Sequence, residues 1–219
     1  MRDFAITSVI CFLLIFLLEA FFFLVENFSM VGCSESVSEK RYQTDRRYKA
    51  DSYLDENISK EYFYHFHKAN ESKWYPYLYW RREGYKSDYI NIDKNGVRKT
   101  CGNECTDSKK FRIFIFGGST VWGTGVGDCE TIPTYVSKML SEKGICAEVL
   151  NFGETGYVSF QETISFLLNL RKGNIPDIAI FYNGVNDVYS AFQQCQAGIP
   201  QNEYRRRANC KTPESLKRV

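Results

Sequence analysis

The sequence is short of histidine, a residue that often serves as a metal ligand or a catalytic base. It holds two histidines, His65 and His67, and neither has a cysteine or carboxylate partner at metal-site spacing. Its eight cysteines include no CxxC pair. The net charge is also small, because 28 Lys and Arg against 26 Asp and Glu leave only +2. We therefore expect no metal site and no nucleic-acid partner, since a near-neutral chain has no electrostatic reason to bind a polyanion.

The cysteine spacing leaves two interpretations open. Cys101 and Cys105 flank a short loop and can pair in an oxidising compartment. The alternative is that most of the cysteines stay unpaired and serve as small apolar side chains.

A long apolar run occupies the N-terminus, from Phe4 to Val25, with Glu19 as its one charge. A helix of this length at about 1.5 Å per residue covers roughly 33 Å, enough for a bilayer core. The run predicts a transmembrane helix 4–25 with the lipid bilayer as partner. Arg2 precedes it and the first basic residue after it is Lys40, which favours a single-pass protein with an extracytoplasmic C-terminal domain. The alternatives are a cleaved signal peptide and a lipoprotein cleavage box that ends at Cys33.

Two further segments precede the main domain. Residues 26–73 begin as a polar stalk rich in Ser, Glu, Lys, Arg and Asp and become aromatic from residue 62. Its basic residues indicate either a solvated stalk or a contact with lipid headgroups. Residues 74–110 are expected to be β-rich, with a hairpin from Tyr89 to Arg98 that turns at Asn95-Gly96. The aromatic residues, Trp74 and Trp80 among them, either pack a small subdomain or stack against sugars.

Residues 111–219 alternate strand and helix patterns. Short apolar runs at 111–116, 147–150 and 177–182 are typical of strands buried on both faces. The first helix is capped by Thr131, carries Pro133 in its first turn and ends at Gly144. A Ser159–Glu162 capping box opens the second helix, which ends at Gly173. The expected apolar faces are Tyr135, Val136, Met139 and Leu140 on the first helix, and Phe160, Ile164, Leu167 and Leu168 on the second. Right-handed crossovers then give a parallel sheet with helices on its faces.

An unusual segment follows each predicted strand: Gly117–Thr120, Asn151–Gly156 and Asn183–Asp187. Because the carboxyl ends of parallel strands share one edge, these three segments are expected to converge. Ser119 is a candidate nucleophile. The backbone N–H groups of Ser119 and Gly156 and the side-chain amide of Asn186 are candidate donors to a developing oxyanion. This set of groups suits ester hydrolysis.

Each segment also has a simpler interpretation. Gly117-Gly118-Ser119 alone is typical of a plain strand-to-helix turn, and Asn186 with Asp187 can merely cap the next helix. A dinucleotide loop at Gly123, Gly125 and Gly127 is not favoured. It begins too late after the strand, and the acidic residues at 128 and 130 would repel a phosphate.

Taken together, the three segments resemble the motif blocks of the SGNH (GDSL-like) hydrolase family. Gly117-Gly118-Ser119 resembles the first block, although many members have Asp where this chain has Gly118. Asn151 with Gly156 resembles the second block, and Gly184-Val185-Asn186-Asp187 resembles the third. Residues 74–100 look like the segment that precedes this domain in membrane-anchored bacterial members. The resemblance implies a flavodoxin-like three-layer α/β fold, here incomplete. It also implies a serine ester hydrolase or acyl transferase, with an acetyl ester of a carbohydrate or lipid as substrate and with no organic cofactor.

The family's catalytic histidine, in a late Asp-x-x-His block, has no counterpart here. No histidine follows Ser119, and residues 195–219 are polar and basic. The chain is therefore expected to be inactive or partial as it stands, unless His65 or His67 folds back over Ser119. The alternatives are a non-catalytic remnant that binds a glycan through Ser119, Asn186 and the aromatic residues, and a gene fragment without function.

Overall fold

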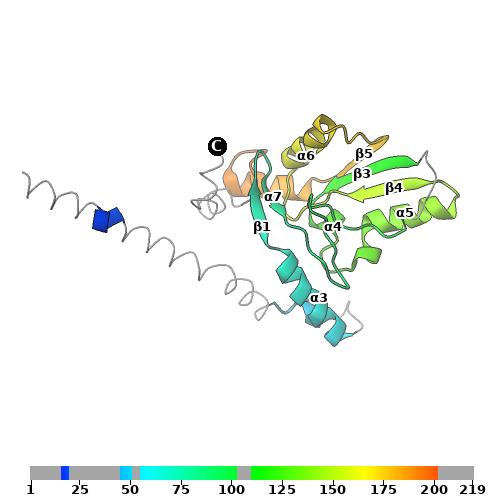
Figure 1. Cartoon of the computed structure of the whole chain (residues 1–219), viewed down its shortest axis with the longest axis horizontal. Coiled ribbons are helices and arrows are strands. Elements are labelled where there is room, and N and C mark those ends of the chain that lie inside the picture. Colours follow the sequence, from blue (N-terminus) through cyan, green and yellow to red (C-terminus); the bar gives the residue numbers. More distant parts are fainter. Residues whose placement is uncertain (1–15, 20–44, 51–54, 103–109, 202–219) are drawn as a thin grey trace, which may run out of the picture. The chain divides into compact units, whose positions relative to one another are not determined.

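The structure, a computed structural model, describes residues 16–19, 45–50, 55–102 and 110–201 (Figure 1). The chain divides into two compact units, residues 1–45 and residues 46–219. Of the first unit, the description covers a short helix at residues 16–19 and Asp45. The account below concerns the second unit.

The predicted transmembrane helix and the single-pass topology need correction. No helix in the described part of the chain is long and apolar enough to cross a membrane. Within Phe4–Val25 the described helix comprises residues 16–19. The rest of that run lies outside the described residues.

A three-stranded parallel sheet forms the centre of the second unit. Its strands are β3 (Phe111–Gly117), β4 (Ala147–Asn151) and β5 (Ile178–Tyr182), in the order β4-β3-β5. Ile113 of β3 pairs with Val149 on one side and with Ile178 on the other. Of these three strands, the one that comes first along the chain, β3, thus lies in the middle, as in the flavodoxin-like order. The α/β part of the expected fold is therefore present, and the three strands match the predicted apolar runs.

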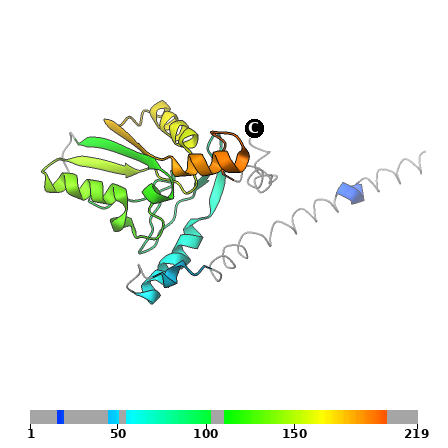
Figure 2. The same cartoon turned by 180° about the vertical axis from the view of Figure 1, so that it is seen from behind.

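Alternation along β3 divides its side chains between two helical layers. Ile113 and Ile115 pack with Val149, Val136 and Leu140, on the side of α5 (Ile132–Glu142). Phe114 and Phe116 point to the opposite face, towards Phe152 and Phe166 of α6 (Ser159–Arg171). The helices therefore cover opposite faces of the sheet, as Figures 1 and 2 show.

Helix α5 begins as its capping pattern predicts. The Thr131 hydroxyl accepts a hydrogen bond from the Thr134 backbone N–H at 3.4 Å, and Gly144 lies just after the C-cap with φ +72°. The predicted apolar face was only half right. Val136 and Leu140 pack on the sheet, whereas Tyr135 and Met139 are exposed.

Helix α6 differs more from the prediction. Its N-cap is Val158, whose N–H donates to the Gln161 side chain at 3.3 Å, so the capping residues lie one position earlier than the expected Ser159–Glu162 box. Gln161 and Glu162 are fully buried, while the predicted core residues Phe160 and Leu167 are exposed. Hydrogen bonds with Leu78 and Asn183 compensate part of the cost of burying these two side chains. A search for apolar periodicity does not detect such bonds.

The aromatic segment forms a second core. Helix α3 (Glu56–Ala69) is capped by Asp55 and buries Tyr62, Phe63 and Phe66 against Ile90, Ile92 and Trp122. A 3-10 turn, η1 (Arg47–Lys49), precedes it, and the Arg47 guanidinium lies over the Phe63 and Phe66 rings. These aromatic residues therefore serve packing.

Two hairpin-like segments follow α3. Strands β1 (Ser72–Tyr75) and β2 (Tyr79–Arg82) pair antiparallel, with Trp74 opposite Trp80. The expected hairpin at 89–98 keeps its turn, closed by a hydrogen bond from the Gly96 N–H to the Asp93 oxygen at 2.9 Å. Its arms are isolated bridges rather than strands, because Ile92 pairs with Tyr85 and with Arg98.

The sheet is uncovered at β5. Among the described strands, β5 has a neighbour only on its β3 side. Helix α7 (Val185–Gln194) leaves the carboxyl end of β5 and exposes apolar side chains, Val188 at 73% and Phe192 at 86%. This edge and helix are the least protected apolar surface of the described residues.

Candidate active site

Ser119 lies in a tight turn between a buried strand and a short helix. Strand β3 ends at Gly117, and helix α4 (Ser119–Trp122) begins at Ser119 with Gly118 as its N-cap. The Ser119 side chain is half-buried. Within the described part of the chain, neither its hydroxyl nor its backbone N–H makes a hydrogen bond. Ser119 therefore has a free hydroxyl and a free N–H at the carboxyl edge of the sheet.

The turn that carries Gly156 is attached directly to the end of β3. The Glu154 N–H donates to the Gly117 carbonyl oxygen at 2.9 Å, and the Tyr157 N–H donates to the Glu154 carbonyl oxygen at 3.1 Å. Gly156 between them has φ +80°, a conformation that favours glycine. Its N–H makes no hydrogen bond among the described residues, so it remains available as a donor.

Asn186 comes to the same edge from the first turn of α7. Its Nδ2 donates to the Tyr157 carbonyl oxygen at 2.8 Å, and its Oδ1 accepts from the Gln201 Nε2 at 3.1 Å. A Cβ atom on Gly118 would lie 2.4 Å from this Nδ2 and 3.9 Å from the Tyr157 oxygen. The amide therefore lies against Gly118, next to Ser119. It keeps a second N–H beyond the one used by Tyr157.

The structure thus brings together the three sequence-predicted segments. Each of Ser119, Gly156 and Asn186 has at least one hydrogen-bond donor without a partner in the described part of the chain. Gly117 contacts the Gly156 turn, and Gly118 contacts the Asn186 amide. Gly118 makes this approach possible because it has no side chain between the turn and the Asn186 amide.

A buried ion pair supports the Gly156 turn, and sequence reasoning missed it. The Arg82 guanidinium bonds to the Glu154 carboxylate and also donates to Thr155 Oγ1 at 2.7 Å and Asn70 Oδ1 at 2.8 Å. Burial lowers the pKa of Arg82 from its ordinary value, and the Glu154 carboxylate opposes that shift. Removing either partner would leave the other charge buried and unpaired. The partners lie 72 residues apart, so no local pattern signals the pair.

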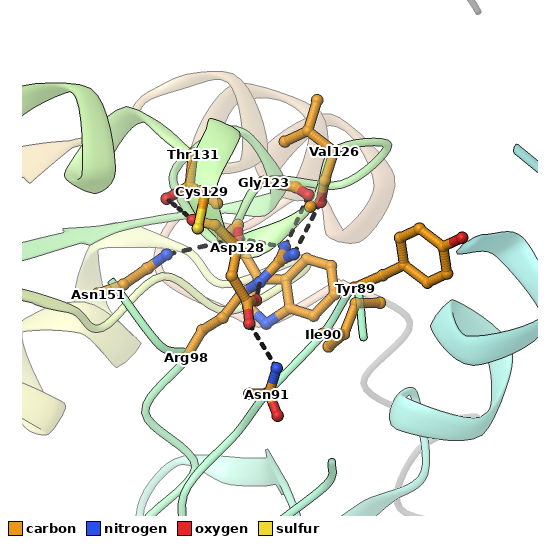
Figure 3. A network of polar contacts seen from close by, with 12 residues as sticks. Tyr89, Ile90, Asn91, Arg98, Gly123, Val126, Asp128, Cys129, Thr131 and Asn151 are labelled. Atoms are coloured by element: carbon orange, nitrogen blue, oxygen red, sulfur yellow. Dashed lines mark hydrogen bonds and ion pairs between the residues drawn. The ribbon is translucent and has the colours of Figure 1, made fainter. Parts of the chain in front are cut away.

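Trp122 at the end of α4 lies close to two arginines. The Arg82 and Arg98 guanidinium carbons lie 4.1 and 4.2 Å from the Trp122 ring centroid, within the range of cation–π contact. Arg98 also donates to the Trp122 and Gly123 carbonyl oxygens at 2.8 Å each and to the Val126 oxygen at 2.7 Å (Figure 3). The buried Arg98 side chain therefore stabilises the backbone of residues 122–126, just after Ser119.

The carboxylate of Asp128 completes this network. Asp128 lies in the 3-10 turn η2 (Asp128–Glu130). Its carboxylate accepts hydrogen bonds from Arg98 Nε at 2.9 Å and from Asn91 Nδ2 at 2.9 Å (Figure 3). This role differs from the phosphate repulsion considered from sequence alone. Asp128 neutralises a buried arginine and so fixes the loop behind the nucleophile turn.

A second polar cluster lies where α6 meets the Asn183–Asp187 turn. Asn183 Nδ2 donates to Glu162 Oε2 at 2.8 Å, while the Glu162 Oε1 atom is buried and has no partner within the described ranges. The Asp187 carboxylate accepts from the Ser159 backbone N–H at 3.0 Å and from its hydroxyl. Burial raises the pKa of Glu162 to about 7. The Asn183 hydrogen bond opposes this shift, and the Asp187 charge adds to it.

Neither histidine is paired with the candidate nucleophile. His65 lies on α3, where its Nδ1 is 2.8 Å from the Tyr85 hydroxyl. His67 is buried on the same helix. A serine hydroxyl is a weak nucleophile unless a base accepts its proton. Because the Ser119 hydroxyl has no hydrogen-bond partner in the described residues, the structure shows no such base beside it.

The cysteines differ from the predicted pairing. Cys101 forms a disulfide with Cys129, with their Cα atoms 5.0 Å apart, so the Cys101–Cys105 pair, one of the two interpretations of the sequence, is wrong. Cys146 is disulfide-bonded as well, and Cys195 is free and exposed. Over the described ranges, no group of three or more His, Cys, Asp or Glu residues is placed to hold a metal ion.

Two cavities are large enough for a small ligand. One of about 650 Å³ lies beside the Cys101–Cys129 disulfide, and one of about 640 Å³ lies between α3 and the loop before α5. Neither is lined by Ser119, Gly156 or Asn186. The candidate site at the sheet edge is therefore separate from both cavities.

Comparisons with known proteins give a distant and partial similarity. No protein-family model matches the chain, and no curated protein matches it. Among solved structures, the chain resembles AlinE4, an SGNH-hydrolase family esterase, at 26% identity and a TM-score of 0.35, over 38% of this chain and 45% of AlinE4. Two mutant forms of AlinE4 match equally, at 26% and 25% identity. The match spans less than half of the length of AlinE4, and nothing in it supports the membrane-anchored type that we expected.

Proposed function

We propose that this chain carries the nucleophile and oxyanion-hole part of an SGNH-type serine ester hydrolase or acyl transferase. One observation carries the proposal: three separate segments place Ser119, Gly156 and Asn186 at one sheet edge with free donors. Ester chemistry needs this combination of a hydroxyl nucleophile with N–H groups that stabilise the charge on the tetrahedral intermediate. The substrate class that we propose is an acetyl or similar small acyl ester of a carbohydrate or lipid.

In this proposal the Ser119 hydroxyl attacks the ester carbonyl carbon, and its proton passes to a base. The carbonyl oxygen becomes negative and accepts hydrogen bonds from the Ser119 and Gly156 N–H groups and the Asn186 amide. Collapse of the intermediate breaks the bond to the alcohol, which leaves with a proton, and Ser119 keeps the acyl group. Water or a second alcohol then removes the acyl group. Since no base lies beside Ser119 in the described residues, we expect the chain alone to be slow.

A cysteine in place of Ser119 tests the oxyanion hole without that base. A thiol is partly ionised near neutral pH and intrinsically nucleophilic, so Ser119→Cys should be acylated by an activated acetyl ester. Thr120→Cys, on the next and exposed residue of α4, is the matched control. Asn186→Ala should slow acylation of the cysteine at 119 by about 10² and leave the cysteine at 120 unchanged. Equal rates with and without Asn186 at position 119 would refute the proposed site.

A glycan-binding remnant is a second candidate, because Trp74 and Tyr77 on the β1–β2 hairpin are exposed. Trp80, which the sequence also suggested for sugar stacking, is buried against Tyr157 and cannot take part. Tryptophan fluorescence titrated with acetylated oligosaccharides tests this candidate. A change that disappears in Trp74→Ala would favour it.

A further inference from the structure

Glu162 is buried at the site edge, and the proposed reaction does not use it. It lies in the first turn of α6, is fully buried, and contacts the turn that carries Asn186 rather than Ser119 itself. Buried carboxyl groups are usually hydrogen-bonded, yet Oε1 of Glu162 has no partner among the residues that the structure describes. Burying an unpaired carboxyl oxygen lowers the stability of the folded chain, which suggests that Glu162 has a role other than packing.

The contacts of α6 suggest that reason. The first turn of α6 holds both ends of one short segment: Glu162 binds Asn183 at its start, and Ser159 binds Asp187 at its end. Gly184 between these anchors has φ +122°, so the backbone turns sharply there. Asn186 lies between the anchors and donates to the Tyr157 oxygen. A shift of either anchor would therefore move the amide away from Gly118.

We propose that Glu162 is a positioning residue, which holds the Asn183–Asp187 turn so that the Asn186 amide stays beside Ser119. This inference rests on the proposed function, since it assigns Glu162 a role only if Asn186 is an oxyanion donor. The Asn183 hydrogen bond to Oε2 favours the carboxylate, but burial and the nearby Asp187 charge favour the neutral acid and outweigh it.

The groups around Glu162 agree with a neutral acid. From the turn after β5, Asn183 and Asp187 face it, and Asp187 is the charged group whose field reaches it. The neighbouring Gln161 donates to the Leu78 carbonyl oxygen at 2.7 Å and carries no charge. The β3 residue beside this helix is Phe116, whose ring contacts Phe166. Burial raises the pKa of Glu162 to about 7, so both forms are populated near neutral pH.

NMR of the Asn186 side-chain amide in the full ¹⁵N-labelled chain tests the proposal without any catalytic turnover. The signal is assigned by its loss in Asn186→Asp. In the wild type it should shift with pH around a midpoint of about 7. Glu162→Gln, which imitates the neutral acid, should hold the low-pH shift up to pH 8.5. Glu148→Gln, a part-buried carboxylate paired with Lys110 and Arg112, is the matched control and should leave the titration unchanged.

A second readout separates this proposal from the proposed function. In the Ser119→Cys background at one fixed pH, Glu162→Ala should slow acylation by a factor approaching the about 10² expected for Asn186→Ala, and Glu162→Gln should restore it. An Asn186 signal that ignores both pH and Glu162→Gln overturns the positioning role, even if acylation depends on Asn186. A signal that titrates as expected while acylation ignores Asn186→Ala supports the positioning of the turn and refutes the esterase site.

Discussion

Glu162 also makes the stability of this protein depend on pH in an unusual direction. Burial raises its pKa in the folded chain from 4.5 to about 7, so the native state holds a proton that the unfolded chain releases. The native state therefore loses relative stability as pH rises from about 4.5 to about 7, and no further above that. One pKa unit corresponds to about 1.4 kcal/mol, so the shift from 4.5 to about 7 sets an upper limit of about 3.5 kcal/mol for the loss.

The perturbation is Glu162→Gln, which keeps the shape and the Asn183 hydrogen bond but cannot titrate. Urea unfolding of both proteins at pH 5 and pH 8 gives the two free energies at each pH. The variant should gain about 1–3 kcal/mol over the wild type between these pH values, because the carboxylates common to both proteins cancel in the difference. A difference that stays constant from pH 5 to pH 8, within about 0.5 kcal/mol, would show that Glu162 is ionised normally in the folded state.

Two further predictions follow from the packing. Replacing both Cys101 and Cys129 with Ser opens a disulfide that spans 28 residues and should lower the free energy of unfolding by about 3–4 kcal/mol, measured by urea unfolding. A loss below about 1 kcal/mol would contradict this. Gly118→Ala should displace the Asn186 amide, since the new Cβ would lie 2.4 Å from its Nδ2, and should slow acylation in the Ser119→Cys background by at least tenfold. Gly127→Ala is the control, because its Cβ would meet nothing closer than 3.6 Å, and an equal effect of both substitutions would refute the role of Gly118.

The sequence alone determined the features that depend on neighbouring residues. The apolar runs predicted β3, β4 and β5, Thr131 predicted the start of α5, and the glycine at 144 predicted its end. The convergence of the Ser119, Gly156 and Asn186 segments also followed from sequence, because parallel strands must end at one edge.

Local patterns failed where the outcome depended on residues far apart in the chain. On α6 the apolar periodicity selected Phe160 and Leu167, but the buried residues are Gln161 and Glu162, because Leu78 and Asn183 supply their hydrogen bonds.

Tertiary structure alone decided what supports the candidate site. Arg82 meets Glu154 across 72 residues, and Cys101 bonds to Cys129 rather than to its near neighbour. Burial of a charge or a polar group is favourable only when a partner is present, and that partner is chosen by the fold and not by sequence spacing. The candidate reacting groups could therefore be predicted from the sequence, whereas the residues that support them became visible only once the chain was folded.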